Sequence, residues 1–118
     1  MNTDVTRLFD ILDRLKENYP DNISILSGKE DGNWLSYSVD QYIEKSHQIA
    51  YALYNLGIKA GDKIATITNN RPEWNFLDMG IMMAGAVHVP VYPTISESDY
   101  KYILSHAEVK LVFIGALL

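Results

Sequence analysis

Cysteine is absent from the 118 residues of this chain. Disulfide bridges, zinc sites built on thiolates and a cysteine nucleophile are therefore excluded, and the sequence does not indicate its redox compartment. Long runs of one charge are also absent, and the net charge is −5. This balance argues against a nucleic-acid partner, because proteins that follow phosphates do so with clustered Lys and Arg.

Glycine-rich loops and long apolar segments are missing as well. The seven glycines are scattered, and none builds a GxGxxG or GxxxxGK phosphate loop. The longest apolar stretch is interrupted by Gly80 and Gly85, so it is too short to span a bilayer. The N-terminus lacks the pattern of a secretory signal. We therefore expect a soluble, cytoplasmic protein of one domain, residues 1–118.

The second half of the chain alternates between strand and helix patterns. Pro at a first helical position loses no hydrogen bond, so Pro72 marks the start of a helix that Gly85 ends. The pattern predicts, in order, a strand at 63–68, a helix at 72–84, a strand at 86–91, a helix from 96 to about 107 and a strand at 109–114. Short connections make this a parallel βαβαβ unit.

The first half is expected to add a helix and a small β-hairpin. Apolar residues at helical spacing predict a helix that Thr3 caps and Pro20 follows, and its face is Val5, Leu8, Phe9, Leu12 and Leu15. The hairpin would pair strands 23–26 and 34–37 around a turn at 29–33. A further helix at 38–56 begins with a Ser38–Gln41 capping box, with Tyr37 stapled to Tyr42, and Gly57 ends it. The fold class is α/β, with helices flanking the sheet.

The helix after Pro72 is apolar on every side from Met79 to Ala84. We expect that its partners within the chain do not cover it. Leaving about 400 Å² of apolar surface in water would forfeit about 10 kcal/mol, which is the size of a domain's net stability. Either more chain belongs here, or two copies pair as a homo-oligomer. The core-type strand so close to Leu118 favours a piece of a longer protein.

Three segments carry a resemblance to a known family. Residues 56–65 read LGIKAGDKIA, residues 70–74 read NRPEW, and residues 83–93 read MAGAVHVPVYP. They resemble the corresponding elements of AMP-forming acyl-CoA synthetases, members of the adenylate-forming enzyme superfamily, and are most similar to its long-chain fatty acid branch. Residues 37–53, 94–96 and 102–104 continue the pattern, so the resemblance covers nearly the whole chain.

The resemblance implies that the parent enzyme joins a fatty acid to coenzyme A. ATP and Mg would convert the acid to an acyl-adenylate, and the thiol of coenzyme A would displace AMP. Its phosphate loop, ribose-binding acid, metal-binding Glu and mobile lysine have no match in these residues. We therefore expect that this chain is the first part of the large domain of such an enzyme and needs the rest of the same enzyme chain. We expect it to contain no catalytic, cofactor-binding or metal-binding residues and to be inactive alone. Membrane association of the parent stays open.

Several side chains nevertheless invite a functional reading. His47 and His106 are expected on helix surfaces and His88 within a sheet, packed or hydrogen-bonded, because the three share no metal-ligand spacing. Arg71 and the Tyr92–Pro93–Thr94 turn follow strand ends, where α/β proteins bind ligands. The sequence favours the simpler interpretations, an exposed arginine near a helix start and a turn fixed by Pro93. Packing roles are expected for Met79, Met82, Met83, Trp34 and Trp74.

Three hypotheses therefore remain. The first is an N-terminal part of a long-chain fatty acid–CoA ligase. The second is a stand-alone small α/β binding or interaction protein, which the apolar helix disfavours. The third is a small nucleotide-binding enzyme that uses the strand ends after Thr68 and Val91, which the missing phosphate loop disfavours.

Overall fold

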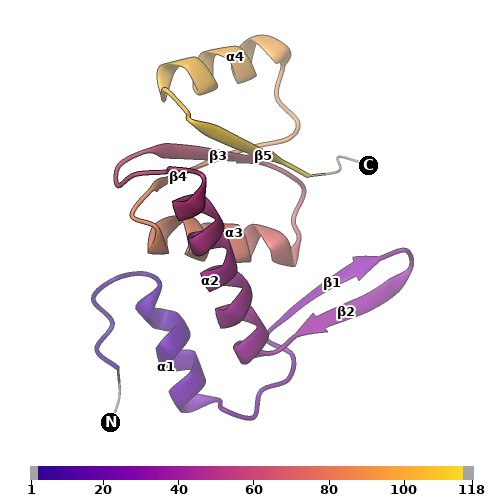
Figure 1. Cartoon of the computed structure of the whole chain (residues 1–118). Coiled ribbons are helices and arrows are strands. Elements are labelled where there is room, and N and C mark those ends of the chain that lie inside the picture. The colour runs from indigo at the N-terminus through magenta and orange to yellow at the C-terminus, as the bar shows by residue number, and fades with distance from the viewer. Residues whose placement is uncertain (1–2, 116–118) are drawn as a thin grey trace.

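A computed structural model describes residues 3–115 and shows two helices and a hairpin followed by a βαβαβ unit (Figure 1). The elements, in chain order, are α1 (Asp10–Asn18), β1 (Leu26–Glu30), β2 (Asn33–Tyr37), α2 (Val39–Asn55), β3 (Lys63–Ile67), α3 (Pro72–Met83), β4 (Val87–Val91), α4 (Glu97–His106) and β5 (Leu111–Ile114). Within these residues no helix has the length and apolar character needed to cross a membrane.

The main sheet has the strand order β4-β3-β5, and both pairings are parallel. Ile64 in the central strand lies opposite His88 on one side and Leu111 on the other. The predicted α/β class and the parallel βαβαβ unit are thus confirmed, with strand and helix ends displaced by one or two residues. β1 and β2 form the separate antiparallel hairpin.

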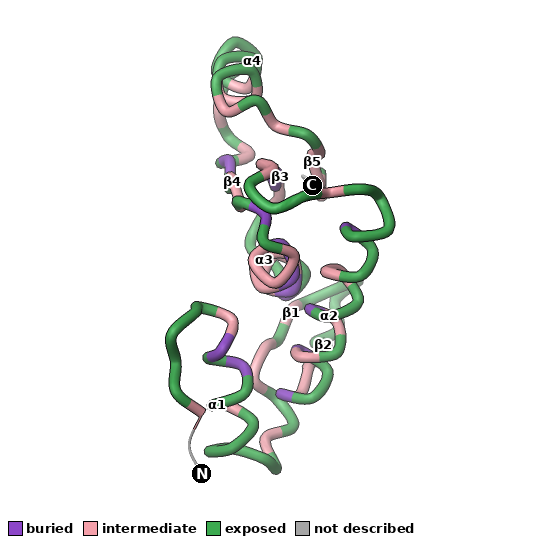
Figure 2. The backbone as a smooth tube through the Cα atoms, turned by 60° about the vertical axis from the view of Figure 1, so that its left-hand side comes forward, coloured by how far each residue is buried: buried purple, intermediate pink, exposed green. Residues whose placement is uncertain are grey.

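The two faces of the sheet are covered by different helices (Figures 1 and 2). Ile64 packs with Leu53 of α2 and Ile81 of α3, whereas Ala65 and Ile67 face a cluster that includes side chains of α4. This division follows from the strand geometry, because successive side chains point to opposite faces. β3 is therefore buried from both sides, as expected for the middle of a parallel sheet.

Helix α3 is better covered than its sequence suggested. No residue from Phe76 to Ala84 is exposed, so the expectation that its partners within the chain are insufficient is wrong. Close approach to α2 explains the difference. A Cβ at Gly80 would lie 2.6 Å from Ile49 Cγ2 and 2.8 Å from the backbone oxygen of Ser46. Glycine lets the two backbones meet where any side chain would hold them apart.

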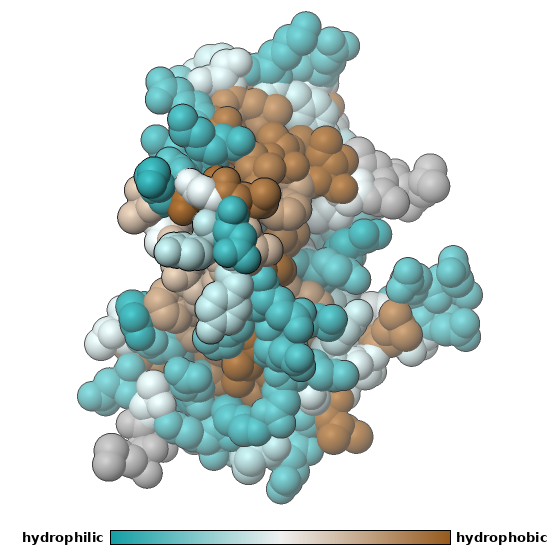
Figure 3. All heavy atoms as spheres, viewed as in Figure 1, coloured by the Kyte–Doolittle hydropathy of each residue, from teal (hydrophilic) through white to brown (hydrophobic). Residues whose placement is uncertain are grey.

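Uncovered apolar surface lies instead at the β5 edge of the sheet. β5 pairs with β3 alone among the described strands, and Ile114 is 71% exposed. Hydrophobic atoms gather over β5 and beneath α4 in the space-filling view (Figure 3). The physical ground for a homo-oligomer through α3 is removed, and pairing of two copies remains a prediction without structural support.

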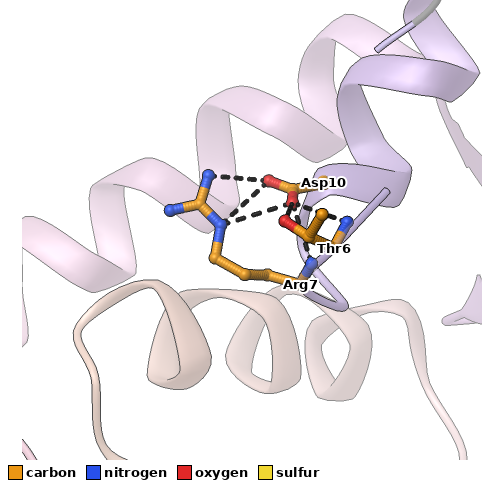
Figure 4. Close-up of polar contacts among 3 residues, drawn as sticks. All are labelled: Thr6, Arg7 and Asp10. Carbon is orange, nitrogen blue, oxygen red and sulfur yellow. Dashed lines mark hydrogen bonds and ion pairs between the residues drawn. The ribbon is translucent and has the colours of Figure 1, made fainter. Parts of the chain in front are cut away.

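Helix α1 begins seven residues later than the predicted cap at Thr3, at Asp10. The carboxylate of Asp10 accepts hydrogen bonds from the backbone N–H groups of Thr6 and Arg7 and from the Arg7 guanidinium (Figure 4). These bonds hold the preceding backbone in a turn, which competes with helix formation. Val5 and Leu8, predicted to line the buried face, are 41% and 62% exposed.

The hairpin exists, but its first strand starts at Leu26 rather than Ile23. Asn22 Oδ1 accepts a hydrogen bond from the Ser24 N–H, an Asx-type turn that delays the strand. The reversal is the two-residue Asp31–Gly32 turn, whose φ angles are 49° and 80°. Positive φ at both central residues matches the twist of the flanking strands, so the predicted five-residue turn is too long.

The predicted caps of α2 are confirmed. Ser38 Oγ accepts from the Gln41 N–H, and Gln41 Oε1 accepts from the Ser38 N–H. Gly57, with φ of 84°, follows the last turn as expected. The rings of Tyr37 and Tyr42 both meet Phe76 edge-on, at 5.0 and 5.7 Å between centroids. The two tyrosines are therefore linked through Phe76 of α3, and the direct Tyr37–Tyr42 staple stays a prediction.

Candidate functional site

The connections that leave β3 and β4 run to opposite faces of the sheet. The chain passes from β3 into α3 on one face and from β4 into α4 on the other. The two connections must separate at the carboxyl ends of these neighbouring strands. Open α/β sheets bind ligands at such a switch point, so the topology alone identifies this edge as the candidate site.

A crevice of about 550 Å³ occupies this position, a size common for small-molecule sites. We call it the β3–β4 crevice, and its lining residues are Thr68, Asn69, Asn70, Trp74, Pro90, Val91, Tyr92, Pro93 and Thr94. Among residues 3–115, no charged side chain lines it. Amides, hydroxyls and an indole make it suited to an uncharged part of a ligand that offers hydrogen bonds and a flat or apolar surface.

Two smaller hollows adjoin the same β3–α3 connection. One, of about 240 Å³, lies between that connection and the hairpin, and its charged lining residues are Lys29, Glu30, Arg71 and Glu73. The other, of about 160 Å³, extends toward β5 and is also lined by Thr68, Arg71 and Trp74. The structure thus brings Arg71 beside the crevice but not into its lining, whereas the Tyr92–Pro93–Thr94 turn forms one wall.

Thr68 has a buried hydroxyl at the junction of the crevice and the hollow near β5. Its Oγ1 finds no hydrogen-bond partner among residues 3–115. Gly115 approaches it so closely that a Cβ there would lie 2.1 Å from Oγ1. An unpaired buried hydroxyl lowers stability unless a water or ligand satisfies it.

Behind the crevice, three polar side chains form a row beneath the sheet. Thr66 Oγ1 lies 2.7 Å from His88 Nε2, and His88 Nδ1 lies 2.7 Å from Asp78 Oδ1. The ring of Trp74 lies against His88, with 5.2 Å between centroids. The prediction that His88 is packed or hydrogen-bonded within the sheet is confirmed. Its partners were missed, although Asp78 is the single acid between Phe76 and Ala84.

Asp78 also influences a neighbouring phenol. Burial, followed by the negative charge of Asp78, raises the pKa of Tyr42 to about 12. Both effects disfavour the tyrosinate, because a buried anion loses hydration and is repelled by a carboxylate. Tyr42 is therefore a neutral packing residue near the row, and it offers no base at neutral pH.

The other singled-out residues lie away from the crevice. His47 and His106 stack on Tyr51 and Tyr102 of their own helices, in agreement with the predicted surface positions. Met79 and Met83 pack against a core cluster, as expected. Trp34 is 70% exposed on β2, so its predicted packing role is wrong. Between residues 3 and 115, no three His, Asp or Glu side chains are arranged to hold a metal ion.

Comparison with known proteins gives consistent matches. The family model described as "AMP-binding enzyme" matches residues 12–117. The chain is 32% identical over 83 residues to the long-chain-fatty-acid–CoA ligase FadD15 of Mycobacterium bovis, covering 70% of this chain and 14% of that protein. It is 40% identical to long-chain-fatty-acid–CoA ligase 1 of Homo sapiens, covering 69% of this chain and 12% of that protein.

Solved structures share the fold. The fatty acid AMP ligase from Legionella pneumophila superposes with a TM-score of 0.79 at 20% identity, covering 92% of this chain and 19% of that one. The N-terminal subdomain of NpsA from Klebsiella oxytoca, in complex with 3-hydroxyanthranilyl-AMSN, superposes with a TM-score of 0.75 at 24% identity. The match covers 91% of this chain and 26% of that one. The chain thus has the fold of the N-terminal subdomain of adenylate-forming enzymes, and it spans about a seventh or less of the two ligases.

Proposed function

Because the chain belongs to the AMP-binding enzyme family, we propose that it is part of a parent enzyme that ligates long-chain fatty acids to coenzyme A. The similarity to two ligases with that activity supports the proposal. In the proposed reaction a carboxylate oxygen of the acid attacks the α-phosphorus of ATP, and the bond to pyrophosphate breaks. The sulfur of coenzyme A, losing its proton, then attacks the acyl carbon, and AMP leaves.

The residues described here do not fit a site for Mg and ATP. The connection after β3 contains no glycine, so its backbone cannot approach phosphates as a phosphate loop does. Residues 3–115 also lack a carboxylate cluster of the kind that holds a divalent cation. We therefore propose that the groups holding ATP and Mg lie on the rest of the parent chain.

The contribution we propose for this chain is one wall of the parent's substrate cleft. The single observation that carries it is the position of the β3–β4 crevice at the switch point of the sheet. Its uncharged lining is suited to the part of a substrate that carries no phosphate. The rest of the same enzyme chain is the proposed partner of the β5 edge. A cytoplasmic location of the parent stays a prediction.

The activity is tested on the full-length protein that contains this sequence. With a long-chain fatty acid, Mg-ATP and coenzyme A, mass spectrometry should detect the acyl thioester together with AMP and pyrophosphate. The 118-residue chain alone should form no thioester, and calorimetry with Mg-ATP should show no specific heat of binding. ADP as the product, or turnover by the short chain, would contradict the proposal.

The role of the crevice is tested with two exposed tyrosines of the full-length protein. Tyr92 lines the crevice and is 80% exposed, whereas Tyr102 on α4 is 67% exposed and does not. Since a neutral hydrogen bond is worth about 0.5–1.5 kcal/mol, Tyr92→Phe should raise KM for one substrate about two- to tenfold with little change in kcat. Tyr102→Phe is the control and should leave KM unchanged. If the two substitutions changed KM equally, the crevice would not be part of the substrate cleft.

A further inference from the structure

The row formed by Thr66, His88 and Asp78 ties three elements together behind the crevice. Thr66 belongs to β3, His88 to β4 and Asp78 to α3, and both connecting distances are 2.7 Å. The His88 side chain is 6% exposed and that of Asp78 is 26% exposed. The row therefore lies largely beneath the sheet, in the layer that otherwise holds apolar side chains.

Hydrogen-bond chemistry assigns the protons in this row. An ionised carboxylate only accepts hydrogen bonds, so Nδ1 of His88 must carry the proton that Asp78 accepts. When the imidazole is neutral, Nε2 is an acceptor, and the Thr66 hydroxyl donates to it. Every strong donor and acceptor of the ring is paired, and the two partners fix the plane of the imidazole.

Trp74 is the side chain that this fixed imidazole meets. Its indole lies against His88 at 5.2 Å between centroids, with 48° between the ring planes. Trp74 also lines the β3–β4 crevice and the hollow beside β5. The indole thus separates the buried row from the candidate site, and its orientation sets the shape of both hollows.

We propose that Thr66, His88 and Asp78 act as a positioning relay that holds the Trp74 indole as a fixed wall of the β3–β4 crevice. His88 is a positioning residue here and not a catalytic one, since Trp74 stands between it and the crevice. The importance of that wall for substrate binding rests on the proposed function. The relay itself is a property of this chain and is testable without a ligand.

The protonation pattern is tested directly in the unmodified chain. Long-range nitrogen–proton correlation spectra of the 118-residue protein, labelled at its three histidines, distinguish the tautomers of each ring. His88 is expected as the pure Nδ1–H form at neutral pH, whereas exposed His47 and His106 should average between forms. A His88 that carries its proton on Nε2, or that averages like the other two, would overturn the relay.

Positioning of the indole is tested in a Trp34→Phe background, which leaves Trp74 as the single tryptophan. Asp78→Ala should lower Trp74 fluorescence anisotropy and increase its quenching by acrylamide. Asp78→Asn should restore both values, because its amide oxygen still accepts from Nδ1–H. His88→Phe keeps a ring but loses both hydrogen bonds, so it should behave like Asp78→Ala. His106→Phe is the matched control and should change neither value.

The outcomes separate the relay from simple packing. If His88→Phe keeps Trp74 as ordered as in the parent background, ring packing alone positions the indole and the relay is refuted. If Asp78→Ala does not fold, the tautomer measurement and the Asp78→Asn variant still decide. None of these measurements involves a substrate. An inactive full-length protein would overturn the ligase proposal and leave the relay standing, and the reverse also holds.

Discussion

Gly80 provides the sharpest test of how this chain packs, because two physical effects predict opposite signs for Gly80→Ala. Helix propensity alone predicts a gain of about 1 kcal/mol, since Ala is the better helix former. Packing predicts a loss. The new Cβ would lie 2.6 and 2.7 Å from Cγ2 and Cβ of Ile49 and 2.8 Å from the Ser46 backbone oxygen.

The packing loss should exceed the propensity gain. Overpacking a core contact by one methyl group costs about 1–3 kcal/mol, and neither neighbour can move easily. The Ser46 oxygen is backbone within α2, and Ile49 is β-branched and stiff about χ1 in a helix. Subtracting the gain of about 1 kcal/mol from the upper part of that range leaves a net loss of about 1–2 kcal/mol.

Urea denaturation followed by circular dichroism measures this difference on the 118-residue chain. Gly80→Ala should lower the urea midpoint at unchanged slope, which signals lost stability rather than an altered unfolded state. Combining it with Ile49→Ala removes one of the two side-chain contacts, so the double variant should lose less than the sum of the two single losses. A Gly80→Ala protein as stable as the wild type, or more stable, would refute the close crossing of α2 and α3.

Three further predictions concern pH and the hairpin. The Arg7 hydrogen bonds lower the pKa of Asp10 below its ordinary 3.8, so the stabilising contribution of the carboxylate is complete above that pH and is lost as pH falls. In thermal melts measured at a series of pH values, Asp10→Asn should therefore reduce the fall of the melting temperature toward acid pH. The pKa of Tyr42 is raised from 10.0 to about 12, so the free energy of unfolding should fall as pH rises through that interval. Tyr42→Phe should remove this fall in the same melts. A Cβ at Gly28 would lie 2.6 Å from Pro72 Cδ, so Gly28→Ala should speed hydrogen exchange in the hairpin while α2 is unaffected.

Local signals made the βαβαβ half of the fold predictable. Pro72 and Gly85 delimit α3, and the β-branched run from Lys63 to Ile67 is a strand on any pattern argument. The predicted start of α1 was wrong because a local hydrogen bond overrides the apolar pattern. Val5 and Leu8 fall at helical spacing, but the Asp10 carboxylate binds the backbone that this helix would need. The spacing of apolar residues does not reveal which side chain accepts a hydrogen bond from a backbone N–H group.

The candidate site also has one feature that the sequence could predict and one that it could not. Its place could be anticipated, because Tyr92 and Asn69 follow strand ends and parallel strands end at one edge. The relay could not, because residues 66, 78 and 88 share no spacing and come from three elements. The β3–β4 register brings Thr66 within 2.7 Å of His88, and the packing of α3 against the sheet brings Asp78 within 2.7 Å of the same ring. A histidine in a strand pattern is therefore uninformative until its neighbours are known.

Helix α3 links these observations, since it is held at three points along its length. Pro72 packs against the hairpin at Gly28, Asp78 binds His88 under the sheet, and Gly80 lies against α2. Trp74 lies between the first two contacts, on the first turn of the helix. A side chain on a helix fixed on both sides of it has little freedom to follow a ligand. The β3–β4 crevice is thus preformed on its Trp74 wall, and adaptation to a substrate must come from the exposed Tyr92–Pro93–Thr94 side.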